Sequence, residues 1–240
     1  MELGPIESIA LTSLADSTNI SFAADRQAWD LTNICFTRGT LIKKSDGEVP
    51  VEQLKVGDLV YTEDHGLQPI RWIGSNRLDA IDLAMKPKLQ PILICKDALA
   101  PGFPAQDLLV SPQHRVLVRS AIAQRMFDED EVLIPANKLL AIDGIEIQHD
   151  NPDGVEYFHM LFDAHEIVCA NGAWTESLLT GPEALKAVSP EARTEIKTLF
   201  PEICEPGFAP VSARYIPEEG KNIKRLVQRH VQDKKPLYVN

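Results

Sequence analysis

The sequence predicts an all-β body followed by a helical C-terminal extension, and three observations support this fold class. Between residues 40 and about 175, short apolar runs such as TLIKK, GDLVYT, IRWIG, HRVLV and HEIVCA recur between turn residues. Many short strands separated by Gly, Pro, Asp and Asn are typical of β-sandwiches and barrels. Long helical segments do not alternate with these runs, so an α/β fold is disfavoured. The hydrophobic period changes after Gly181, where helices are predicted.

The elements divide the chain into three parts. Residues 1–34 are polar and rich in Ser, Thr, Asp and Asn, which indicates a loosely structured leader. Residues 35–181 form the predicted β body, in which Asp46-Gly47 is a hairpin signal because glycine tolerates the positive φ of such turns. Residues 182–240 form the predicted helical extension, which either packs on the body or binds a protein partner.

Two helices are predicted in the extension. The first follows Ser189-Pro190-Glu191, a helix cap followed by a first-turn proline and an acidic residue, and it ends at Pro201. The second lies in the stretch that begins at Pro217 and has one apolar face. That face consists of Ile223, Leu226, Val227 and Val231.

Composition excludes several classes of function. The 240 residues are 44% hydrophobic, enough for a substantial core, and 24 basic against 35 acidic residues give a net charge of −11. This charge argues against a nucleic-acid partner. The four cysteines have no Cys-x-x-Cys spacing, so neither a metal site nor a disulfide framework is expected, and no cofactor is indicated.

Targeting signals are not apparent. The N-terminus has no basic region followed by an apolar run, so a secretory signal is not expected. No run approaches the roughly 18 apolar residues of a membrane helix. The cytoplasm is therefore the default location, and secretion by a route independent of the general signal remains open.

One cysteine lies in a context that indicates chemistry. Cys35 follows Ile34 and leads into Gly39-Thr40, and a Leu-x-x-Gly-Asp-x-Val string begins at Leu54. A thiol directly after the Ile34 carbonyl can attack it intramolecularly, which requires orientation rather than encounter. The product would be a thioester. The attack needs thiolate character, stabilisation of the oxyanion and a proton for the departing nitrogen.

Two later blocks offer partners for this thiol. LLVSPQHRVLV contains Ser111 and His114, and a turn at Pro112 would let both side chains converge on one peptide. His114 is the candidate acid because histidine transfers protons near neutral pH. The block YFHMLFDAHEIVCANGAWTESL contains His159 and His165, two further candidates.

In this order the three blocks resemble those of the Hint domain, the self-processing module shared by hedgehog C-terminal domains and inteins, and they are most similar to the bacterial Hint group. The resemblance covers roughly residues 35–180 and implies a horseshoe-like β fold and an N–S acyl shift at Ile34-Cys35. It also implies that Ser111 and His114 act on the scissile peptide, with His159 and His165 near the polar groups of the late block.

The chain departs from the intein pattern at its C-terminal end. An intein ends in His-Asn before Cys, Ser or Thr, but here Thr175-Glu176-Ser177 stands in that place and about 60 residues follow. Glutamate and serine cannot perform the asparagine cyclisation that completes splicing. Hedgehog domains also use an aspartate before the second block, where this chain has Arg71, so cholesterol is not supported as the nucleophile.

We therefore expect autoproteolysis of the Ile34-Cys35 bond without full splicing. The substrate is the protein's own N-terminal segment, and water or a small nucleophile resolves the thioester. One alternative is a Hint-fold binding or regulatory module that cleaves nothing. A third hypothesis is a cysteine hydrolase that acts on other molecules with Cys35 and a histidine as a dyad.

Overall fold

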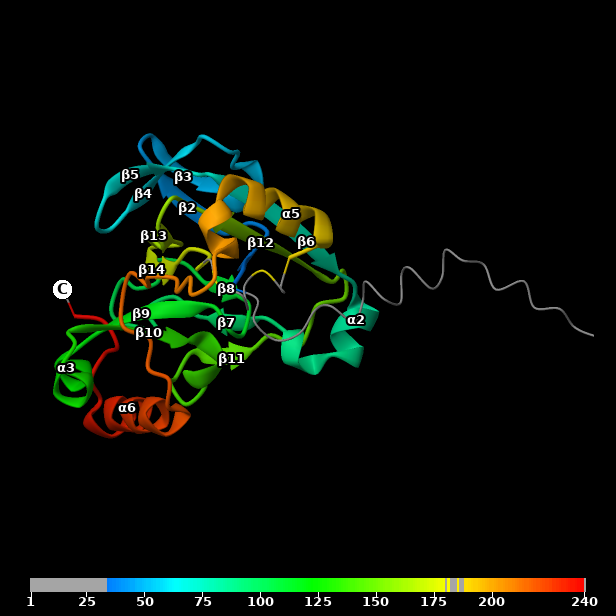
Figure 1. The fold of residues 1–240 in the computed structure, drawn as a ribbon. Helices are drawn as coiled ribbons and strands as arrows, with labels where there is room; N and C mark the ends of the chain where they lie inside the picture. The colour runs from blue at the N-terminus through cyan, green and yellow to red at the C-terminus, as the bar shows by residue number, and fades with distance from the viewer. Residues whose placement is uncertain (1–33, 180, 182–184, 186–187, 240) are drawn as a thin grey trace, which may run out of the picture.

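The computed structural model describes residues 34–179, 181, 185 and 188–239, so the predicted leader lies outside the described residues except for Ile34. Two antiparallel sheets form the body (Figure 1), which confirms the all-β prediction. The smaller sheet has the order β11-β7-β8-β1-β12-β6. Its strands are β1 (Phe36–Thr37), β6 (Trp72–Leu78), β7 (Ile92–Ile94), β8 (Leu108–Val110), β11 (Ile145–Ile147) and β12 (Val155–Leu161).

The larger sheet has the order β10-β9-β14-β13-β2-β4-β5, and β3 pairs with β2. Its strands are β2 (Leu41–Lys44), β3 (Gly47–Pro50), β4 (Leu59–Thr62), β5 (Gly66–Pro69), β9 (Arg115–Arg119), β10 (Glu131–Pro135), β13 (Ile167–Ala170) and β14 (Ala173–Glu176). Strands β2 and β3 form the predicted hairpin, in which Lys44 is opposite Gly47 and Gly47 has a φ of +130°. Only glycine adopts this conformation readily.

Short helices interrupt the body and are not visible in the hydrophobic pattern. The two α-helices are α2 (Ala80–Met85) and α3 (Ala121–Phe127), and the 3-10 turns are η1 (Val51–Gln53), η2 (Pro87–Leu89) and η3 (Ala136–Lys138). Both α-helices begin at a side-chain cap, Asp79 for α2 and Ser120 for α3. Such a cap satisfies an amide that has no partner within the helix.

The extension contains α5 (Pro190–Leu199), the 3-10 turn η4 (Pro201–Cys204) and α6 (Gly220–Asp233). Helix α5 is capped by the Ser189 side chain and confirms the first predicted helix. The predicted apolar face of α6 is correct at Ile223, Leu226 and Val227 but wrong at Val231, which is 47% exposed. His230 is buried instead.

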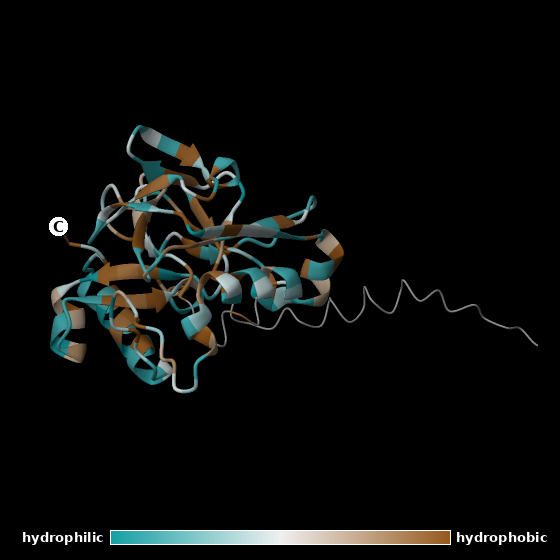
Figure 2. Ribbon diagram, turned by 45° about the horizontal axis from the view of Figure 1, so that its top comes forward, coloured by the Kyte–Doolittle hydropathy of each residue, from teal (hydrophilic) through white to brown (hydrophobic). Residues whose placement is uncertain are grey.

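Apolar residues of both sheets share one core, which includes Ile42 and Val60 of the larger sheet and Ile94 and Val110 of the smaller one. Figure 2 shows this distribution, with hydrophobic residues along the strands. Ile223, Leu226 and Val227 of α6 belong to the same core, so α6 packs on the body. No helix in the described part of the chain is long and apolar enough to cross a membrane.

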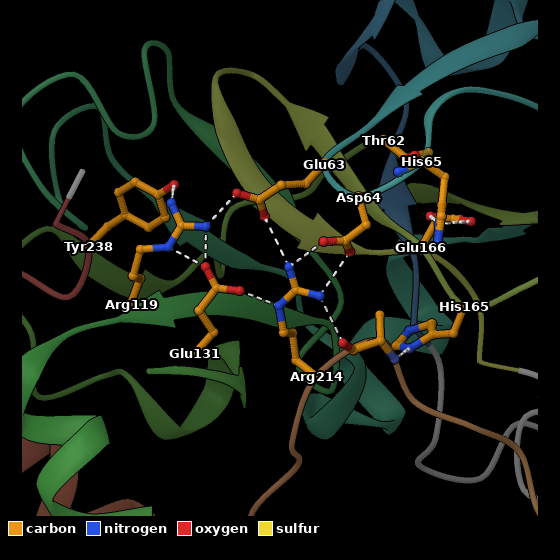
Figure 3. Close-up of polar contacts among 11 residues, drawn as sticks. Thr62, Glu63, Asp64, His65, Arg119, Glu131, His165, Glu166, Arg214 and Tyr238 are labelled. Atoms are coloured by element: carbon orange, nitrogen blue, oxygen red, sulfur yellow. Dashed lines mark hydrogen bonds and ion pairs between the residues drawn. The ribbon is translucent and has the colours of Figure 1, made fainter. Parts of the chain in front are cut away.

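A cluster of charges attaches the segment between α5 and α6 to the body (Figure 3). The Arg214 guanidinium donates to both carboxylate oxygens of Asp64, at 2.7 and 2.8 Å, and also pairs with Glu131. Arg119 pairs with Glu63 and Glu131. Because these side chains are partly buried and form a network, they restrain the segment more than isolated surface pairs would.

Candidate active site at the Ile34-Cys35 peptide

Strand β1 lies between β8 and β12, and this position creates the candidate site. Phe36 is opposite both Val110 of β8 and Phe158 of β12. Because both pairings are antiparallel, moving one residue back along β1 places Cys35 opposite Ser111 on one side and His159 on the other. The structure therefore brings two predicted site residues to the scissile peptide from adjacent strands.

His159 contacts both groups that must react. Its Nδ1 lies 2.9 Å from the carbonyl oxygen of Ile34, and the Cys35 Sγ lies 3.4 Å from Nε2 and 3.6 Å from Nδ1. A carbonyl oxygen only accepts hydrogen bonds, so Nδ1 carries the hydrogen in the neutral ring and Nε2 is free to accept the thiol proton. One imidazole can thus polarise the carbonyl and act as the base for the nucleophile.

Ser111 binds the other side of the same peptide. Its hydroxyl oxygen accepts a hydrogen bond from the Cys35 amide at 3.0 Å, and its own amide donates to the Cys35 carbonyl, also at 3.0 Å. The chain then turns as expected at Pro112, because the His114 amide donates to the Ser111 carbonyl at 3.0 Å. This turn moves the chain from β8 in one sheet to β9 in the other and places His114 next to the junction.

His114 is completely buried and packs edge-on against the Phe36 ring, with 4.5 Å between the ring centroids. Neither ring nitrogen has a hydrogen-bond partner among the described residues. Burial lowers the pKa of His114 to about 4, although the nearby Glu176 carboxylate and the Cys35 backbone favour the charged form. His114 is therefore neutral at pH 7 and lies next to the Cys35 backbone.

Burial also determines the protonation of the reacting pair. It raises the pKa of the Cys35 thiol well above its ordinary range, which the hydrogen bond with Ser111 only partly opposes. It lowers the pKa of His159 to about 4, while the bond to the Ile34 carbonyl favours the charged ring. The resting pair is consequently a neutral thiol and a neutral imidazole, not a thiolate-imidazolium pair.

The fifth candidate, His165, lies elsewhere. Its Nε2 is 3.2 Å from a carboxylate oxygen of Glu176, and its Nδ1 accepts a hydrogen bond from the Ala213 amide at 3.0 Å. Glu176 also accepts hydrogen bonds from the backbone and guanidinium of Arg115. The structure does not bring His165 to the Ile34-Cys35 peptide, and a role for it in cleavage stays a prediction.

Sequence reasoning missed two features of the site. Glu176 is a completely buried carboxylate whose charge acts on His114, although in the sequence it marks only a departure from the intein ending. Ile34 is only 7% exposed and belongs to an apolar cluster built partly by the extension. Neither feature has a local sequence signal, since both depend on segments more than 60 residues apart.

The described residues contain no group of three or more His, Cys, Asp or Glu side chains that could hold a metal ion. The other cysteines are also unpaired thiols. Cys95 and Cys169 are half-buried, and Cys204 is exposed.

Comparisons with known proteins identify the family of the chain. A family model described as the Hint domain matches residues 34–182. Among solved structures, a bacterial intein-like domain from Clostridium thermocellum is 14% identical, with a TM-score of 0.39 over 60% of this chain and 99% of its own. The gp41-1 intein is 13% identical, with a TM-score of 0.36 over 59% and 97%.

The Ssp DnaB mini-intein variant M86 is 11% identical, with a TM-score of 0.34 over 60% of this chain and 93% of its own. No curated protein sequence is significantly similar to the chain. The family match covers more than half of the chain and includes Cys35, Ser111, His114 and His159. The chain belongs to the Hint domain family.

Proposed function

We propose that this Hint protein cleaves its own backbone between Ile34 and Cys35 through a thioester and does not splice. The observation that carries the proposal is the position of His159, whose two ring nitrogens face the Ile34 carbonyl oxygen and the Cys35 sulfur. A base for the nucleophile and a donor for the developing oxyanion are both needed in acyl transfer. Here one buried side chain provides both.

The acyl shift can be written with its atoms and protons balanced. Nε2 of His159 takes the proton from Sγ of Cys35, and the sulfur attacks the Ile34 carbonyl carbon. The new oxyanion accepts the hydrogen bond from Nδ1. The bond between the Ile34 carbon and the Cys35 nitrogen then breaks as the nitrogen gains a proton, which leaves a thioester on sulfur, a free amine on Cys35 and the former thiol proton on His159.

His114 is the proposed acid for the departing nitrogen. A peptide nitrogen is a poor leaving group unless it is protonated as the bond breaks. The Cys35 backbone favours the charged form of His114, and Glu176 stabilises the same charge. The cationic ring would donate its proton to the Cys35 nitrogen and return to the neutral form that the buried site prefers.

The thioester is resolved by water or a small nucleophile, and residues 1–34 are released. Ser177, which stands where an intein would place its acceptor region, is completely buried, and its hydroxyl accepts a hydrogen bond from the Glu166 amide at 2.9 Å. The proposal therefore ends at N-terminal cleavage.

The test compares the full chain with its Cys35→Ala variant by intact mass, with and without hydroxylamine or a thiol. The wild type should lose residues 1–34, faster with the added nucleophile, and the hydroxylamine product should carry a hydroxamate at Ile34. Cys95→Ala, which removes a half-buried thiol outside the site, should cleave like the wild type. An uncut wild type under every condition would refute the proposal.

A second candidate function is a Hint-fold binding or regulatory module that retains its leader. The burial that raises the pKa of the Cys35 thiol favours this candidate, because a protonated thiol is a weak nucleophile. The same mass measurement decides between the two functions.

A further inference from the structure

The side chain of Ile34, the residue that would carry the thioester, is buried in an apolar cluster to which the C-terminal extension contributes. Ile34 is 7% exposed and belongs to a cluster of buried apolar residues, here called the Ile34 cluster. Its other members are Trp72, Leu161, Leu178, Leu185, Val188, Ile196, Phe200 and Ile203. The family match ends at residue 182, so most of these partners come from outside the matched region.

The Ile34 cluster has two sides of different origin. Trp72 of β6 and Leu161 of β12 are directly opposite each other in the smaller sheet and form the side that belongs to the body. The side that belongs to the extension consists of Ile196 of α5, Ile203 of η4 and Phe200, which lies between these two elements. Ile34 therefore connects two parts of the chain that are far apart in sequence.

Specific hydrogen bonds hold the extension over the sheet at this point. The Trp72 indole Nε1 donates to the Glu195 carboxylate of α5 at 2.9 Å, and the Leu178 amide donates to the Met160 carbonyl of β12 at 2.9 Å. Met160 follows His159, so the end of the body, just before the extension begins, is tied to the strand that carries the proposed base. In Figure 1, α5 lies across β12 and β6.

We propose that the C-terminal extension is the binding site for the side chain that precedes Cys35, and that it makes cleavage selective for a large aliphatic residue at position 34. The predicted selectivity of cleavage rests on the function proposed above. The enclosure of Ile34 by the extension does not depend on that function. Shortening a buried branched side chain leaves a cavity. Placing a charged side chain in the same apolar surroundings is also unfavourable, because the charge loses its hydration. The acyl group would remain in this enclosure after the N–S shift, since the new bond joins the Ile34 carbon to the neighbouring sulfur.

The first experiment measures the enclosure without any cleavage. In the Cys35→Ala chain, Ile34→Ala should make the amides of α5 exchange with solvent about tenfold faster or more, because the helix loses part of its packing. Ile34→Val should change this exchange by less than about threefold, since only one methylene is lost. Ile223→Ala is the matched control, an isoleucine of the same extension that lies in the main core.

The control separates local loosening from a general loss of stability. Ile223→Ala should accelerate exchange in α6 and leave α5 close to the parent, whereas Ile34→Ala should do the reverse. Equal exchange of α5 in the parent and Ile34→Ala chains would overturn the proposal, and so would equal acceleration by both variants.

The second experiment uses the active chain and measures cleavage in hydroxylamine. Ile34→Ala and Ile34→Asp should cleave at least about tenfold more slowly than the wild type, because the carbonyl is no longer held in its attack position. Ile34→Val should remain within about threefold. Equal cleavage rates for the wild type and the three Ile34 variants would overturn the proposed selectivity. An uncut wild type would instead overturn the proposed cleavage, and the exchange experiment would then test the enclosure of Ile34 by itself.

Discussion

Cleavage should accelerate as the pH falls, because the proposed acid must be cationic. With a pKa of about 4, His114 is charged in roughly one molecule in a thousand at pH 7 and in roughly one in ten at pH 5. A step that requires the cation should therefore become about tenfold faster per pH unit, or about 100-fold faster from pH 7 to pH 5. His159 stays neutral over this range and remains available as the base, since its pKa is also about 4.

The assay follows release of residues 1–34 by intact mass at several pH values. The nucleophile must be present at a concentration where the rate no longer depends on it, so that the acyl shift alone is observed. Circular dichroism at each pH verifies that the chain is folded. His149→Gln, which removes an exposed histidine, should keep the slope.

A flat profile between pH 8 and pH 5.5 would refute this reasoning. Such a profile would mean that His159 transfers the thiol proton of Cys35 to the Cys35 backbone nitrogen, so that a cationic His114 is not needed. In that event His114→Gln should still cleave. If His114 is the acid, the same variant should be slower and have no acid-promoted rise.

Three further predictions concern stability and are measured by urea unfolding of the Cys35→Ala chain. Acidification from pH 8 to pH 5 should lower the free energy of unfolding by about 2 kcal/mol for each of His114 and His159, because the unfolded rings gain protons below pH 6.5 while the folded rings stay neutral until about pH 4. Ser111→Ala should cost about 1–3 kcal/mol, since the buried scissile amide loses its acceptor. Gly172→Ala should cost about 2 kcal/mol or more, because φ is +80° and the new Cβ would lie 2.6 Å from that of Ala105.

Matched variants isolate each of these effects. Replacing His114 and His159 with glutamine should remove most of the added acid sensitivity, and an unchanged slope would contradict the assigned neutral state. Ser111→Thr keeps the hydroxyl and should cost less than Ser111→Ala. Gly220→Ala at the start of α6 meets no atom within 4 Å and should be close to neutral. A comparable loss in Gly220→Ala would show that the cost at Gly172 is not specific to its conformation.

The parts of the fold that could be predicted from the sequence are those encoded by local signals. The Asp46-Gly47 turn and the cap at Ser189 depend on neighbouring residues, and the structure has a hairpin and a helix there. Helices α2 and α3 have six and seven residues, too short for a clear helical period.

The predicted apolar face of α6 is wrong at Val231 for a physical reason. A hydrophobic pattern assigns Val231 to the core and His230 to solvent, but polar partners reverse this order. The His230 ring bonds to the Ser120 hydroxyl at 3.1 Å and to the Lys235 carbonyl at 3.1 Å, which satisfies it when buried. The sequence pattern contains no information about such partners.

The site could be predicted further than the fold around it, because its residues occur in blocks with recognisable spacing. The turn at Pro112 was expected from the chain alone and is present. His165 belongs to the same late block as His159, yet only His159 lies on the strand next to β1. Strand order, which separates these two histidines, is a tertiary property and is not visible in either block.

The register that brings Cys35, Ser111 and His159 together also buries them. Because β1 lies in the middle of its sheet, Cys35 faces Ser111 and His159 at hydrogen-bond distance but is completely removed from water. The same burial that aligns the thiol with the Ile34 carbonyl stabilises its neutral form, and it stabilises the neutral form of both histidines. Forming a thiolate-imidazolium pair in this buried site therefore costs free energy, unless the negative charge moves onto the Ile34 carbonyl oxygen as the sulfur attacks. In the proposed mechanism, proton supply to His114 and the enclosure of Ile34 by the extension are then the two properties that set the rate of cleavage.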